Sequence, residues 1–114
     1  MGVAVFVEEE LLNAVTALSG SGPAYVYLFA KAMMDSGIGM GMDINTAKKL
    51  AMQTLEGSIK MLKGDKTPEE LISMVRSKGG TTYAALEVFK NENFEQTIDK
   101  AMQQAKARAD ELSQ

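Results

Sequence analysis

The stretch Ser19-Gly20-Ser21-Gly22-Pro23-Ala24-Tyr25 leads into Val26-Tyr27-Leu28-Phe29-Ala30-Lys31-Ala32-Met33-Met34. It predicts a helix start, because Pro23 suits the first helical position, where a missing N–H is no loss and φ is already helical. Ser21 or Gly22 is then the N-cap. From residue 24 to residue 34 only Lys31 is charged, so this helix lacks the polar side of an amphipathic surface helix. The pattern therefore predicts a central helix that must be covered on every side.

The material that covers the central helix is expected to be protein. A helix needs about 20 apolar residues to span a bilayer, and residues 24–34 are too few, so no membrane partner is expected. A chain of 114 residues surrounds one central helix only partly with its own elements. A second copy of the chain is the expected source of the rest, which makes an obligate homodimer our hypothesis.

The composition limits the chemistry that the chain can perform. A formal net charge of −3 and a pI near 4.9 leave no basic stripe to neutralise phosphates, which argues against a nucleic-acid partner. The chain has no His and no Cys, so we expect no metal site of the usual zinc kind, no thiol nucleophile and no Ser-His-Asp triad. Any chemistry must use hydroxyls, carboxylates, lysines or backbone amides.

The same composition bears on location and domain count. A chain of this length is expected to form one domain that buries roughly two-thirds of its unfolded surface. Without cysteine there are no disulfides, and a cytoplasmic location is the default expectation. The segment from Met1 to Val7 lacks a basic start and a long apolar run, so it does not resemble a signal peptide.

Start signals and apolar spacing predict about six helices and no paired strand, which makes the fold class all-α. The expected helices cover about residues 8–18, 23–34, 44–62, 68–76, 83–89 and 94–112. Asp43 is the expected N-cap of the third, and Thr67 with Glu70 predicts a capping box for the fourth. Asn93 with Gln96 predicts a second capping box, and Gly37 is the expected C-cap of the central helix.

The loop of residues 77–82 is the one segment whose composition suggests more than a turn. Gly79 and Gly80 let the backbone turn tightly and approach a ligand, and the helix that follows adds the positive end of its dipole. Thr81 and Thr82 add hydroxyls that donate or accept hydrogen bonds. Such a loop suits a small carboxylate or phosphate, although composition alone favours an ordinary helix-helix turn with threonine caps.

Three segments of the chain form a recognisable set. They are Ala14-Val15-Thr16-Ala17-Leu18-Ser19-Gly20-Ser21-Gly22-Pro23-Ala24-Tyr25, Pro68-Glu69-Glu70-Leu71 and Val75-Arg76-Ser77-Lys78-Gly79-Gly80-Thr81-Thr82. Together they resemble the C-terminal domain of the pyrroline-5-carboxylate reductase family. The resemblance runs from about Val3 to Leu112, and the first and third segments are far more specific together than either is alone.

The resemblance implies reduction of 1-pyrroline-5-carboxylate to L-proline with NADPH or NADH, the last step of proline biosynthesis. It implies an N-terminal Rossmann domain for the nucleotide. It also implies an all-helical domain, like the C-terminal domain of 6-phosphogluconate dehydrogenase, that interlocks as a homodimer and in many members assembles further. Residues 1–7, with a β-like run from Val3 to Val7, are then the end of a missing Rossmann domain or a linker. Residues 8–114 are the dimerisation and substrate-binding domain, which alone binds no nucleotide and is expected to be inactive.

The resemblance also assigns roles by position. The backbone around Gly79, Gly80 and Thr81 is expected to hold the substrate carboxylate, helped by Ser77. The hydroxyl of Thr82 is expected to bond the ring nitrogen as the catalytic group. These roles agree with the chemistry of an anion at a helix N-terminus.

Two positions depart from the family pattern. Arg76 stands where a small Thr or Ser is usual, and we assign it no substrate role. Lys78 stands where Pro is frequent, and it adds a backbone N–H and a positive charge beside the expected anion site.

Two functions of other classes stay open. In the first, the chain is a stand-alone, non-catalytic helical dimer, and residues 77–82 form only a turn. In the second, it is a peptide-binding bundle with a methionine-rich groove, for which the residues are Met33, Met34, Met40 and Met42. The second ranks last, because methionines buried as core filler explain that pattern equally well.

Overall fold

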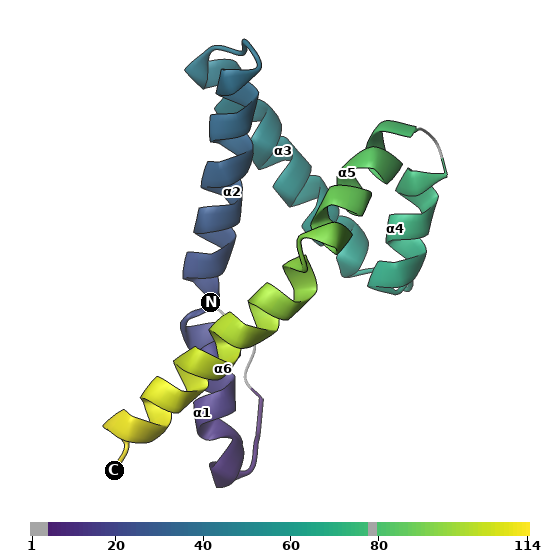
Figure 1. Ribbon diagram of the computed structural model, residues 1–114. Helices are drawn as coiled ribbons and strands as arrows, with labels where there is room; N and C mark the ends of the chain where they lie inside the picture. Colours follow the sequence, from purple (N-terminus) through teal and green to yellow (C-terminus); the bar gives the residue numbers. More distant parts are fainter. Residues whose placement is uncertain (1–4, 78–79) are drawn as a thin grey trace. The chain divides into compact units, whose positions relative to one another are not determined.

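The computed structural model describes residues 5–77 and 80–114, and every regular element in these ranges is helical (Figure 1). The all-α prediction is therefore confirmed. The elements are η1 (Glu9–Leu11), α1 (Leu12–Val15), η2 (Thr16–Gly20), α2 (Gly22–Gly39), α3 (Ile44–Leu62), α4 (Pro68–Arg76), α5 (Gly80–Asn91) and α6 (Phe94–Leu112). Of the expected β-like run, Val3 lies outside the described residues, and Val5 to Val7 form neither helix nor strand.

The first predicted helix is a succession of a 3₁₀ turn, an α turn and a π turn. In the π turn the N–H of Ser21 donates to the carbonyl of Thr16, five residues earlier, at 2.8 Å. Pro23 explains the wide turn, because a proline has no N–H and its ring crowds the carbonyl four residues before it in a regular α-helix. The hydroxyl of Tyr25 donates to the carbonyl of Ala17 at 2.6 Å and ties the start of α2 to the π turn.

Helix α2 runs further than predicted, and the assignment of Gly37 as its C-cap is wrong. Gly37 lies inside the helix, and a Cβ built there would meet the Sδ atom of Met42 at 3.1 Å. The side chain of Met42 therefore packs close to the backbone of α2 at Gly37. The helix ends at Gly39, and the left-handed backbone that favours glycine is found at Gly41, where φ is 110°.

The N-caps predicted for α3 and α4 are confirmed. Asp43 accepts a hydrogen bond from the N–H of Thr46 at 2.9 Å, and this bond lowers the pKa of its carboxyl. Thr67 and Glu70 form the reciprocal capping box, with N···O distances of 3.1 and 2.8 Å. Both signals are local, so neighbouring residues were enough to predict them.

The predicted capping box of Asn93 and Gln96 is wrong. Asn93 adopts the left-handed conformation, with φ 59° and ψ 45°, and its side chain makes no cap bond. Asn93 lies in the short link between α5 and α6, and asparagine tolerates the left-handed conformation. Instead, the backbone carbonyl of Asn93 accepts hydrogen bonds from the N–H and hydroxyl of Thr97 at 2.9 and 3.0 Å.

The chain divides into two compact units. The first contains the described residues up to Val26 together with Asn93–Gln114, and in it α6 packs against α1 and η2. The second is Tyr27–Glu92, in which α4 contacts both α3 and α5. Within the second unit, one small apolar hollow is lined by residues of the C-terminal half of α2, of the link that follows it and of the first turns of α3.

Burial within the chain is confined to small side chains. Among the described residues, the buried apolar ones are Ala17, Ala30, Ala47 and Ala51. The large apolar side chains of α2 stay exposed: Val26 by 53%, Tyr27 by 71% and Leu28 by 68%. Alanines let helices approach closely, but each buries little apolar surface. A single chain thus leaves the central helix largely uncovered, as the sequence predicted for a helix that needs a second copy.

A polar cluster links the N-terminal and C-terminal segments of the chain that together form the first unit. The side-chain amide of Asn13 in α1 donates to Asp110 in α6 at 2.8 Å, and Lys106 forms an ion pair with the same carboxylate at 3.1 Å. The hydrogen bond from Asn13, and then the one from Lys106, hold the pKa of Asp110 below its ordinary value of 3.8. The carboxylate therefore contributes stability above about pH 3.8 and loses it as pH falls through the folded pKa.

This cluster predicts a pH-dependent effect of Asn13→Ala. The variant is expected to be less stable than wild type at about pH 7, and the difference should be smaller at about pH 2.5, because falling pH moves towards protonation of the Asp110 carboxylate through its lowered pKa. Urea unfolding at the two pH values measures it, with Asn91→Ala as a control outside the cluster. A difference between Asn13→Ala and wild type that is equal at both pH values would contradict the linkage.

Candidate functional site

Ser77 follows the last residue of α4 and is exposed. Its N–H donates to the carbonyl of Ser73 at 3.0 Å, and its hydroxyl donates to the carbonyl of Met74 at 3.1 Å. The hydroxyl is therefore occupied by its own helix. It must rotate away from Met74 before it can donate to a ligand.

The N-terminus of α5 presents the other described residues of the expected site. Gly80 is the first helical residue, and Thr81 and Thr82 follow it in the first turn. A Cβ built on Gly80 would have no atom within 4 Å, so the space beside its backbone is open. Thr81 is exposed and Thr82 is half-buried. Gly79, also expected in the site, and Lys78 lie outside the described residues.

The electrostatics of this turn favour an anion. The first turn of α5 carries no acidic side chain, whereas α4 has Glu69 and Glu70 in its first turn. The first N–H groups of a helix have no partner within the helix and add the positive end of its dipole. Among residues 5–77 and 80–114, no hydrogen bond engages the hydroxyls of Thr81 and Thr82. The turn can thus offer backbone N–H groups and two hydroxyls to a small carboxylate.

The described residues offer little for a metal ion, a membrane or a bound peptide. No group of three or more acidic, His or Cys side chains in residues 5–77 and 80–114 could hold a metal ion. Nor does any helix in that part of the chain have the length and apolar character needed to cross a bilayer. The apolar hollow between α2 and α3 is lined by Met33 and Met42 among others and has a volume of about 140 Å³. That volume is below the 300 Å³ or so of a small-molecule pocket and does not suit a bound peptide.

Comparison with known proteins identifies the family. Residues 9–112 match the family described as "Pyrroline-5-carboxylate reductase dimerisation". The chain belongs to this family. "Pyrroline-5-carboxylate reductase 2" of Bacillus subtilis is 41% identical over 115 residues, which span 100% of this chain and 41% of that protein.

Part of each solved reductase structure has the same fold as this chain. The Plasmodium falciparum pyrroline carboxylate reductase with NADP bound is 33% identical, has a TM-score of 0.89, and is matched over 94% of this chain and 43% of that one. The Coxiella burnetii reductase is 34% identical, with a TM-score of 0.90 over 96% of this chain and 41% of that one. The chain thus spans about two-fifths of each of these relatives.

The structure also contains contacts that the sequence did not predict. The bond from Tyr25 to the carbonyl of Ala17 and the bond from Asn13 to Asp110 join residues with no local pattern between them. Pro23 was the available sequence signal near the first contact. It predicted the start of a helix, but it did not predict the π turn before that helix.

Proposed function

We propose that this chain is the dimerisation and substrate-carboxylate-binding part of a pyrroline-5-carboxylate reductase. The observation that carries the proposal is the family match over residues 9–112. The complete reductase is proposed to reduce 1-pyrroline-5-carboxylate to L-proline with NADPH or NADH in the cytoplasm. Its partners are a second copy of the chain and the small substrate, with no nucleic acid or membrane.

The exposed apolar surface supports a homodimer. A central helix with Val26, Tyr27 and Leu28 more than half exposed needs a cover, since apolar area left in water forfeits roughly 25 cal/mol per Å². The contacts that bury the alanines within each unit leave these larger side chains exposed. An interlocked dimer, with further stacking of dimers, would cover them.

The first turn of α5 supports the proposed substrate site. The backbone N–H groups of Gly79, Gly80 and Thr81 would hold the carboxylate, and Ser77 would join them after its hydroxyl turns from Met74. Thr82 would bond the ring nitrogen. During reduction the imine carbon takes the hydride and the nitrogen takes a proton, so a hydroxyl beside that nitrogen can orient the ring and stabilise the changing charge.

The nucleotide is proposed to bind outside this chain. The chain corresponds to about two-fifths of its relatives, one of which has NADP bound, and the hydride donor would lie in the part that the chain does not cover. The chain alone is therefore expected to bind no nucleotide and to be inactive. In the alternative, a stand-alone helical module, the loop of residues 77–82 would bind neither proline nor a cyclic carboxylate analogue.

Sedimentation equilibrium of the 114-residue chain at micromolar concentration tests the dimer. The expected mass is twice the chain mass of 12.3 kDa. A compact, helical monomer of 12.3 kDa at that concentration would contradict the proposed association.

A further inference from the structure

The chain turns from α2 into α3 through a corner that comprises residues 37–47. The N–H of Met42 donates to the carbonyl of Gly37 at 3.1 Å. One residue earlier, the N–H of Gly41 donates to the carbonyl of Ile38 at 3.0 Å. With φ 110° at Gly41, these two bonds form a Schellman motif, which often includes an apolar contact back onto the last turn of the helix. Here Met42 is the residue that makes this contact.

The thioether of Met42 packs at the place where the two helices approach each other. A Cβ built on Gly37 would meet the Sδ atom of Met42 at 3.1 Å and the Cβ atom of Ala47 at 3.6 Å. Met42 also lines the small apolar hollow, together with Met33 and Ala51 among others. Ala47 and Ala51 are two of the buried alanines. Met42 therefore contributes to the packing of α2 and α3 within one chain.

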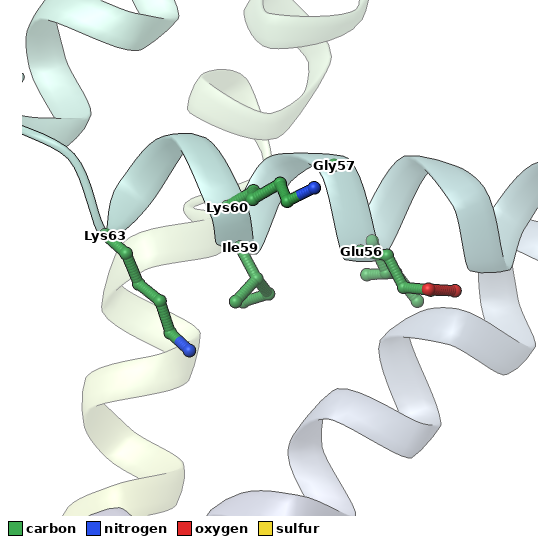
Figure 2. A pocket seen from close by; sticks show the side chains of 6 residues that line it. Glu56, Gly57, Ile59, Lys60 and Lys63 are labelled. Carbon is green, nitrogen blue, oxygen red and sulfur yellow. The ribbon is translucent and has the colours of Figure 1, made fainter.

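A second hollow, in the other half of α3, differs in this respect. It has a volume of about 480 Å³, and Figure 2 shows that its labelled residues all lie on one helix. None of its described lining residues is a methionine. A chemical change there would alter the surface of a single helix, whereas a change at Met42 acts where two helices approach each other.

The Met42 thioether is open to one well-defined chemical change. The residue is 40% exposed, so hydrogen peroxide can reach it from solvent. The sulfur attacks one peroxide oxygen, the O–O bond breaks, an S=O bond forms, and the second oxygen leaves as water. The sulfur loses two electrons and the peroxide gains them. The product is a polar sulfoxide in place of an apolar thioether.

The hollow offers no free donor to a sulfoxide oxygen. Among its described lining residues only Thr54 carries a hydroxyl, and that hydroxyl donates to the carbonyl of Leu50 at 2.8 Å. A polar group without a hydrogen-bond partner is unfavourable in apolar surroundings. The oxidised side chain must turn out into water, and its packing against Gly37 is then lost.

We propose that Met42 is an oxidation site at which peroxide weakens the corner between α2 and α3. The contacts that carry this proposal all lie within one chain, so it does not depend on the proposed dimer. Because methionine sulfoxide can be reduced back to the thioether, the change is reversible.

Peroxide treatment of the wild-type chain, of Met42→Leu and of Met40→Leu tests the proposal. Leucine keeps the approximate volume of methionine but has no sulfur to oxidise. Met40 is the matched control, because it is 80% exposed, lies two residues away and does not line the hollow. The other methionines are shared by all three proteins. Oxidation should lower the urea midpoint of the wild type and of Met40→Leu by about 0.5 M more than that of Met42→Leu.

Amide hydrogen exchange gives a measurement that does not depend on the variants. In the oxidised wild-type chain the N–H of Met42 should exchange about 10-fold faster than before treatment. The N–H of Glu70, which bonds Thr67 in the capping box of α4, should keep its rate. Peptide mass spectrometry locates the sulfoxides. Equal losses of stability in all three proteins would overturn the proposal, as would a Met42 thioether that stays intact while Met40 is oxidised.

Discussion

Replacing Thr82 with alanine in a reductase that contains this chain is expected to lower turnover by about 30- to 1000-fold. The estimate follows from the loss of one hydrogen bond to a changing charge in a water-excluded site, which is worth about 2 to 4 kcal/mol. Thr82 is half-buried in the first turn of α5, and no other described residue engages its hydroxyl. Steady-state kinetics with saturating nucleotide measure the effect.

The affinity for NADPH should stay near the wild-type value in this variant, because the nucleotide is proposed to bind elsewhere. Thr54→Ala is a matched control, since Thr54 also lies in a helix and its hydroxyl donates to the carbonyl of Leu50 in the same helix at 2.8 Å. An unchanged turnover in Thr82→Ala would remove the catalytic role from Thr82. Equal losses in both variants would indicate a general effect of threonine removal on stability.

Leu28→Glu is expected to raise the dissociation constant of the dimer by more than about 100-fold. The leucine is 68% exposed in the single chain, and the proposed dimer buries it. An unpaired charge in a buried interface destabilises it by about 3 to 5 kcal/mol, and about 1.4 kcal/mol corresponds to a tenfold change in affinity. Sedimentation equilibrium over a dilution series measures the shift.

Gln53→Glu provides the control for charge. Gln53 is an exposed polar residue of α3, so the same added charge should leave the dimer intact. A Leu28→Glu chain that associates as tightly as Gln53→Glu would show that this part of α2 faces water in the assembled protein.

The parts of the fold that the sequence predicted are those with short-range causes. The Asp43 cap and the capping box of Thr67 and Glu70 each involve residues three positions apart, so the pattern and its contact coincide. The same reasoning failed at Asn93, which adopts a left-handed conformation and whose side chain makes no cap bond. It also failed at Gly37, where a contact with Met42 decides the use of glycine.

The candidate site, like the fold, could be predicted from local sequence only in part. The prediction that the first turn of α5 binds an anion follows from glycines and threonines at a helix start, which local composition can indicate. The specific roles of Ser77 and Thr82 came from resemblance to a family and stay predictions. The bond between Ser77 and Met74, which limits what Ser77 can donate, depends on a side-chain rotamer that no sequence pattern specifies.

Among the described residues, the buried apolar side chains are only those of Ala17, Ala30, Ala47 and Ala51, and this affects how the stability of the protein should be measured. If most of its apolar contacts are made between copies, its unfolding equilibrium includes chain concentration as a variable. Each tenfold dilution would then remove about 1.4 kcal/mol of apparent stability. A melting temperature for this chain would have meaning only beside the protein concentration at which it was recorded.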